Sequence, residues 1–138
     1  MNARYLRGVE ILEAVTGNPA EQLTNRVAEV APDFARMTIE FPFGDLYARD
    51  ALDLRAREIA AIAALAALGS AAPQLRVHVA AALHLGMTRT EIVEILMQTA
   101  IYAGFPAALN ALAACHDLLV DEPACAPCQA ASRVAGHG

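Results

Sequence analysis

Glycine and proline residues divide this chain into short segments, and the pattern inside the segments is helical. No run of four or more residues alternates cleanly between apolar and polar types, as a half-buried strand would. Helices are predicted over about residues 3–16, 20–30, 32–48, 54–68, 73–85, 89–103 and 107–120. The sequence therefore predicts an all-α fold of about six or seven helices.

Local signals define several helix ends. Asp53 is a favourable N-cap, Thr88 opens a capping box, and Gly69 suits the left-handed backbone that ends many helices. Pro42 and Gly44 are expected to bend the third helix or to end it early.

The length is typical of one domain. A chain of 138 residues can bury enough apolar surface for a single core, which we expect to span residues 1–120. Residues 121–138 are rich in proline and alanine and hold few large apolar side chains. We expect them to form a loosely ordered tail.

Charge and hydropathy exclude several classes of protein. Ten Lys and Arg residues against fifteen Asp and Glu give a net charge of −5, with no basic run, so nucleic acid is not an expected partner. The longest apolar run, residues 59–68, is about half of the ~20 residues that a membrane span needs. The first residues carry charges where a signal peptide is apolar, so we expect a cytoplasmic protein.

The segment 54–68 is rich in alanine. Small residues on nearly every side let other helices approach from several directions, so we expect this helix to be buried all round. Charged residues make up only 18% of the chain and apolar residues 57%, which leaves little charge to cover the outside. We therefore expect a homo-oligomer; a monomer with an unusually apolar surface is the alternative.

Glu58 interrupts an apolar stripe that Leu54 and Ile62 share at helical spacing. A buried carboxylate must find partners or take up a proton, which is how a general acid or base arises. An ordinary ion pair with Arg55 or Arg57, or solvation near the helix start, is the alternative interpretation.

His78 lies beside Leu75 and Val79 on the inward side of its predicted helix, where an imidazole can transfer protons. A hydrogen-bonded histidine of the core is the alternative. No histidine and carboxylate show a metal-site spacing such as His-Glu-x-x-His. We expect neither a metal nor another cofactor.

Three cysteines are a small and odd number, which argues against a disulfide framework, so we expect free thiols. Cys125 and Cys128 have the Cys-x-x-Cys spacing of a redox pair or of half a zinc site. They lack a predicted helix to activate them, and only His137 lies nearby as a further ligand. Cys115 is expected to pack as a small core residue.

Several short segments, in this order, resemble the carboxymuconolactone decarboxylase family: FGDLYAR at 43–49, LRARE at 54–58, ALAALG at 64–69, RVH at 76–78, GMT at 86–88, EIVE at 91–94 and YAGFPAA at 102–108. The resemblance covers about two-thirds of the chain. It implies the helical fold of alkylhydroperoxidase D-like proteins and assembly into trimers or hexamers with sites near subunit interfaces.

The peroxidase branch of this superfamily carries a Glu and then Cys-x-x-Cys-x-x-x-His, with the His eight residues before a Gly. His78 and Gly86 keep that interval, and Glu58 and His78 match the proton-relay residues of the branch. The two cysteine positions hold Ala71 and Gln74. The chain therefore resembles the branch without the redox pair.

The resemblance implies a cofactor-independent acid–base lyase that acts on a small carboxylated lactone or related carboxylic acid, in the breakdown of aromatic compounds. His78 is the expected general acid, and Glu58 is expected to orient it. The residues expected to bind the substrate are Arg57 or Arg76 for its carboxylate, with Asp45, Tyr47, Tyr102 and Phe105 around it.

Two other functions remain open at this point. One is a thiol-dependent peroxidase or oxidoreductase that uses Cys125 and Cys128. The other is a non-catalytic, oligomeric ligand-binding protein in which Glu58 and His78 form a structural hydrogen bond.

Overall fold

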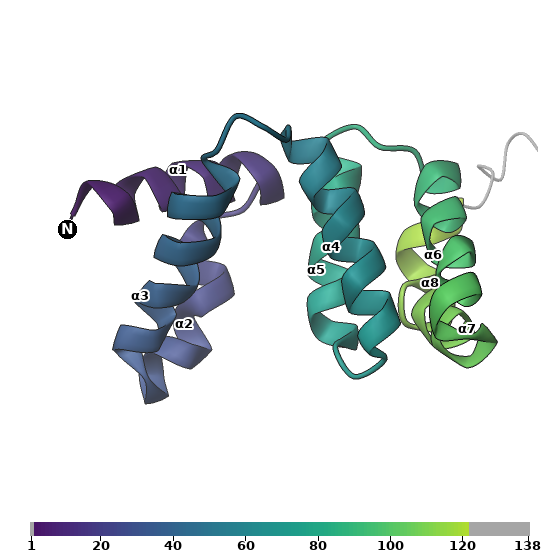
Figure 1. Ribbon diagram of the computed structural model, residues 1–138. Coiled ribbons are helices and arrows are strands. Elements are labelled where there is room, and N and C mark those ends of the chain that lie inside the picture. Colours follow the sequence, from purple (N-terminus) through teal and green to yellow (C-terminus); the bar gives the residue numbers. More distant parts are fainter. Residues whose placement is uncertain (1, 122–138) are drawn as a thin grey trace, which may run out of the picture.

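The structure of the protein is a computed structural model that describes residues 2–121, and within this range it is all-α, as predicted (Figure 1). The helices are α1 (Ala3–Thr16), α2 (Ala20–Val30), α3 (Pro32–Ile39), the π-helix η1 (Glu40–Tyr47), α4 (Leu54–Leu68), α5 (Ala72–His84), α6 (Arg89–Ala103), α7 (Phe105–Ala114) and α8 (His116–Leu119). All of the expected tail after residue 121, with Cys125, Cys128 and His137, lies outside the described residues.

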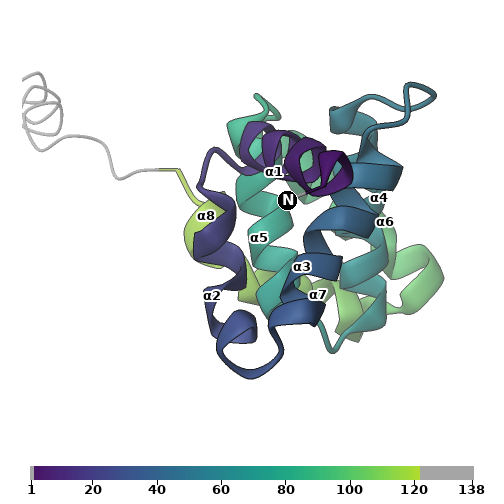
Figure 2. The same cartoon turned by 90° about the vertical axis from the view of Figure 1, so that its left-hand side faces the viewer.

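The helices form three groups that lie side by side: α1–α3 with η1, then α4 with α5, then α6–α8 (Figure 1). Helix α1 packs on η1 and on α5, and thereby joins the first group to the second, as the turned view in Figure 2 also shows. The larger core lies between α4, α5, α6 and α7, around Ile62, Val79, Ile92 and Leu96. A smaller core around Leu12 and Ile39 holds α1–α3 together.

The predicted helix-end signals are confirmed. The Asp53 side chain accepts a hydrogen bond from the backbone N–H of Ala56, and Thr88 forms a reciprocal capping box with Glu91. Gly69 ends α4 with φ of 74°, a left-handed conformation that other residues adopt at a cost. Asp53 and Gly69 thus set where α4, the helix that carries Glu58, begins and ends.

Helix α1 and η1 approach each other closely through two glycines. A Cβ atom at Gly8 would lie 2.6 Å from the backbone oxygen of Ile39, and one at Gly44 would lie 2.5 Å from that of Arg4. The Arg7 Nε donates a 2.8 Å hydrogen bond to the Gly44 carbonyl across the same contact. Only residues without a side chain let these two backbones meet.

The third α-helix ends early, as expected, and continues as a π-helix from Glu40, two residues before Pro42, which has no N–H to continue the α-helical hydrogen bonds. Two details of the fold differ from the sequence prediction. The last helix divides at Cys115, so the described chain has eight α-helices. The all-round burial expected for α4 is wrong for a single chain, because Ile59 is 37% and Leu68 is 68% exposed.

Among the described residues, no helix combines the length and apolar character that crossing a bilayer requires.

Candidate active site

Glu58 and His78 meet between α4 and α5. Oε2 of Glu58 lies 2.7 Å from Nδ1 of His78, and Glu58 has no exposed surface. Because α4 and α5 pack against each other, the second turn of α4 faces the middle of α5. The predicted contact between the two side chains is confirmed, and their catalytic role stays a prediction.

Tyr47 contacts the other oxygen of the same carboxylate. Its hydroxyl donates a 3.1 Å hydrogen bond to Oε1 of Glu58. Burial raises the pKa of Tyr47 well above its usual range, as do the charge and the hydrogen bond of Glu58, while the charge of Arg57 acts in the opposite direction. The hydroxyl therefore keeps its proton and remains a hydrogen-bond donor at neutral pH.

These contacts determine the roles of the two nitrogens of His78. An ionised carboxylate only accepts hydrogen bonds, so Glu58 accepts one from Tyr47 and one from His78. A neutral His78 then carries its proton on Nδ1, and Nε2 is the nitrogen left for a ligand.

His78 lines a pocket of about 250 Å³. Its other lining residues come from α1, α2, α3, η1 and α5, most of them apolar: Leu12, Val15, Thr16, Leu23, Thr24, Thr38, Ile39, Phe43, Pro73, Gln74, Val77 and Ala81. None of these residues carries a permanent charge. The pocket therefore offers a small molecule a mainly apolar wall, the imidazole of His78, and the uncharged polar groups of Thr16, Thr24, Thr38 and Gln74.

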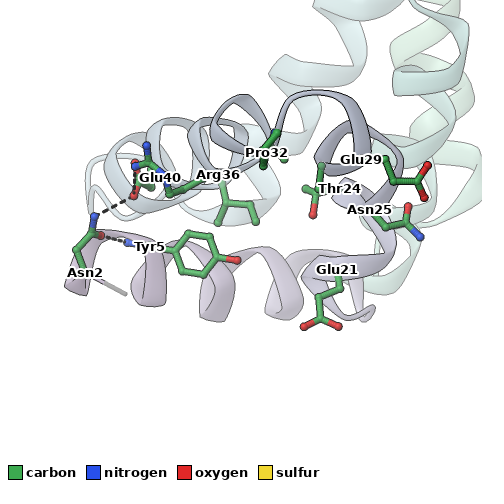
Figure 3. A pocket seen from close by; sticks show the side chains of 12 residues that line it. Asn2, Tyr5, Glu21, Thr24, Asn25, Glu29, Pro32, Arg36 and Glu40 are labelled. Atoms are coloured by element: carbon green, nitrogen blue, oxygen red, sulfur yellow. Dashed lines mark hydrogen bonds and ion pairs between the residues drawn. The ribbon is translucent and has the colours of Figure 1, made fainter.

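A second and larger pocket, of about 940 Å³, lies between α1, α2 and α3 and shares Thr24 and Ile39 with the first (Figure 3). Glu21 and Glu29 lie toward one end of this pocket and Glu40 lies toward the other, with Tyr5 between them.

The carboxylate of Glu40 in this larger pocket is buried and fully paired. It accepts hydrogen bonds from Asn2 at 3.0 Å, from Arg36 at 3.0 and 3.1 Å, and from Arg4 at 3.3 Å. The Asn2 hydrogen bond and then the Arg36 contact hold the pKa of Glu40 below its usual range, against the effect of burial. These hydrogen bonds join the start of α1 to α3 and η1, so we interpret the cluster as stabilising the fold.

The two arginines expected to hold a substrate carboxylate do not line the pocket of His78. The guanidinium carbon of Arg57 lies 5.5 Å from the ring centre of Tyr47, and its Nη2 donates to the carbonyl of Arg49 at 3.1 Å. Arg76 pairs with Asp117 at 2.6 and 3.0 Å. Both cations therefore have partners elsewhere in the chain.

The other expected substrate-binding residues also lie apart from that pocket. Asp45 accepts hydrogen bonds of 2.8 and 2.9 Å from Nε of Arg4, which holds its pKa low. Tyr102 is 83% and Phe105 is 73% exposed, on α6 and α7. They line two other hollows, of about 170 and 350 Å³. Of the expected residues, the structure thus brings together Glu58, His78, Tyr47 and Arg57.

Within residues 2–121, no three His, Cys, Asp or Glu side chains lie close enough together to hold a metal ion. Cys115 is buried in the larger core, where burial raises the pKa of its thiol. Cys125 and Cys128 lie outside the described residues.

The contribution of the first two helices to the pocket was not predicted from the sequence. Leu12 and Thr16 of α1 and Leu23 of α2 face His78 across it, and Phe43 of η1 completes this wall. The i, i+4 spacing of Leu12 and Thr16 indicates a shared helix face. Only the tertiary contact between α1 and α5 shows that this face covers His78.

Comparisons with known proteins find one matching family and two similar sequences. The model of the carboxymuconolactone decarboxylase family matches residues 32–117. The chain is 31% identical over 122 residues to a 4-carboxymuconolactone decarboxylase of Acinetobacter baylyi, covering 86% of this chain and 88% of the relative. It is also 34% identical over 108 residues to an uncharacterized 15.0 kDa protein in the nqo9-nqo10 intergenic region of Paracoccus denitrificans, covering 76% and 81%.

Proposed function

The chain belongs to the carboxymuconolactone decarboxylase family, and on this premise we propose that it is a cofactor-independent acid–base lyase. Its proposed substrate is a small carboxylated lactone or a related carboxylic acid from the breakdown of aromatic compounds. The similarity to the decarboxylase of Acinetobacter baylyi supports this substrate class.

The observation that carries the proposal is the Glu58–His78 pair at the pocket of about 250 Å³. An imidazole that is held at one nitrogen by a buried carboxylate and reaches a ligand pocket with the other is suited to general acid catalysis. Glu58 orients the ring and stabilises the imidazolium, so it acts on the substrate through His78.

Loss of carbon dioxide then needs no further group from the protein. As the bond between the ring carbon and the carboxylate breaks, its electron pair moves into the conjugated carbonyl and forms an enolate. The imidazolium of His78 gives its Nε2 proton to a carbon of this enolate, and the carbonyl is restored. A proton from water returns to His78, so one proton is consumed for each carbon dioxide released.

The apolar lining favours this step. Water solvates a carboxylate strongly and the more delocalised enolate less, so a pocket that excludes water destabilises the reactant relative to the transition state. Leu12, Val15, Phe43 and Val77 supply this lining.

We also propose that the chain assembles with copies of itself. Two separate apolar faces are exposed on one chain: Phe34, Met37 and Phe41 on α3 and η1, and Met97, Ile101, Phe105 and Leu109 on α6 and α7. Contact between one face and the other on a neighbouring copy is head-to-tail, and such contacts form a ring when the rotation from copy to copy closes.

The test of the proposed activity is a decarboxylation assay with 4-carboxymuconolactone and related lactones, followed by release of carbon dioxide. His78→Ala and Glu58→Gln should each lower turnover by roughly 100-fold. His116→Ala, at an exposed histidine of α8, is the matched control and should retain turnover within a few-fold. Undiminished turnover by His78→Ala, or no turnover of any lactone by the unaltered protein, would refute the proposal.

A further inference from the structure

Tyr47 and His78 occupy the two oxygens of one buried carboxylate. The Tyr47 hydroxyl lies 3.1 Å from Oε1 of Glu58, and Nδ1 of His78 lies 2.7 Å from Oε2. Since Glu58 has no exposed surface, water does not compete for either oxygen. Each oxygen therefore has one donor, and the two donors come from different helices.

The ring of Tyr47 is held on two sides. The Phe43 ring packs against it edge to face, with the ring centres 5.0 Å apart and the planes at 60°. The guanidinium of Arg57 lies 5.5 Å from the ring centre and is itself fixed to the carbonyl of Arg49. These contacts place the hydroxyl at a defined point beside Glu58.

Tyr47 does not itself face the pocket of His78. Phe43, one turn earlier, lines that pocket, whereas Tyr47 is absent from its wall. The hydroxyl donates its hydrogen bond to Glu58 and therefore contacts no ligand in the pocket of His78. The contribution of Tyr47 must pass through Glu58.

We propose that Tyr47 is a positioning residue, which holds Oε1 of Glu58 so that Oε2 stays on Nδ1 of His78 and Nε2 stays available to the pocket. Without the hydroxyl, Oε1 is a buried acceptor with no donor, and the carboxylate gains by turning toward His78 or toward Arg57. Either movement disturbs the orientation of the imidazole. The expected effect of Tyr47 on the rate rests on the proposed function. Its expected effect on the orientation of the His78 ring rests on geometry alone.

Tyr47→Phe tests the proposal because it removes one oxygen atom and keeps the ring contacts with Phe43 and Arg57. The first measurement is the ¹⁵N chemical shifts of His78 by NMR at a pH where its ring is neutral, which report the ratio of the two tautomers. The unaltered protein should show the proton on Nδ1. Tyr47→Phe should show a measurable fraction on Nε2, and Tyr5→Phe, the matched loss of a hydroxyl at a half-buried tyrosine of α1, should show none.

The second measurement is steady-state kinetics with a lactone that the unaltered protein turns over. Tyr47→Phe should lower kcat by roughly tenfold, the scale of one hydrogen bond to a charged group, and should leave KM unchanged because Tyr47 does not contact the ligand. A purely structural role would lower the melting temperature while tautomer ratio and kcat stay as they are, and that result would overturn the proposal.

The two proposals fail separately. Absence of turnover with every lactone refutes the proposed function, and the tautomer ratio still decides the role of Tyr47. If Tyr47→Phe does not fold, Tyr47→Met takes its place, since it also removes the hydroxyl and keeps an apolar side chain in the same position. An unchanged tautomer ratio in that variant also overturns the proposal.

Discussion

Oε2 of Glu58 lies 2.7 Å from Nδ1 of His78, although 20 residues of chain separate the two. The contact depends on the turn between α4 and α5, where Gly69 ends the first helix and Ala72 begins the second. It also depends on burial, because a carboxylate without exposed surface has only protein partners. The same contact therefore matters for folding as well as for chemistry.

Removing His78 should lower stability by a moderate amount. In His78→Ala the Oε2 atom of Glu58 loses its donor inside the protein, which costs about 1–3 kcal/mol. His78→Gln, whose amide can still donate, should lose less. The free energy of unfolding from urea titrations checks both variants, and equal stability of His78→Ala and the unaltered protein would contradict the expectation.

Gly8→Ala should destabilise the packing of α1 on η1. The new Cβ would meet the Ile39 backbone oxygen at 2.6 Å and its Cγ2 at 2.9 Å, so the helices must move apart, and overpacking of this kind costs about 1–3 kcal/mol or more. Gly69→Ala is the control, since no atom lies within 4 Å of its Cβ position and only its φ of 74° opposes the change. Thermal unfolding should show the larger loss for Gly8→Ala; the reverse order would contradict the packing described.

Glu40 should contribute stability that acid removes. Its pKa is lowered in the folded state by the Asn2 hydrogen bond and by Arg36, so the unfolded chain binds more protons at low pH. The contribution is present above the ordinary glutamate pKa of about 4.3 and is lost as pH falls through the lower folded value. Glu40→Gln should be less stable than the unaltered protein at pH 7, and the difference should shrink below about pH 4. Urea unfolding across this pH range measures it, and a constant difference would contradict the assignment.

The sequence predicts the helix ends well because their signals are local. Asp53 caps α4 through a residue three positions away, and Thr88 does the same for α6. The burial of Glu58 followed from the helical spacing of Leu54 and Ile62, since one helix face turns toward one neighbour.

The exposed side of α4 and the partners of the predicted site residues depend on contacts between distant segments of the chain. Alanine content does not tell which side of α4 has a neighbour, so the exposure of Leu68 was missed. Arg76 was predicted to bind a substrate carboxylate. In the structure it pairs instead with Asp117, which lies 41 residues later in the chain. Tyr47 was expected near a ligand and instead contacts Glu58, because η1 presents it to α4.

A charged residue introduced on the exposed apolar face of α6 and α7 should prevent the proposed assembly. Sedimentation equilibrium of the unaltered protein should give a multiple of the chain mass of 14.5 kDa, with three or six copies. Ile101, which is 74% exposed on this face, would be buried in the contact, so Ile101→Glu should shift the mass toward the single chain. Gln22→Glu, on the exposed side of α2, is the control and should not. A monomeric unaltered protein at micromolar concentration would refute the assembly.

Removing all three thiols should leave turnover within a few-fold, because the proposed relay uses none. Cys115 is fully buried, so Cys115→Ala changes packing in the larger core, while Cys125→Ser and Cys128→Ser remove the Cys-x-x-Cys pair. The matching experiment is His78→Ala in the same lactone assay, where turnover should fall by roughly 100-fold. A thiol mechanism predicts the opposite pair of results. A cysteine-free variant without activity, beside an active His78→Ala, would therefore assign the chemistry to the thiols and remove it from Glu58 and His78.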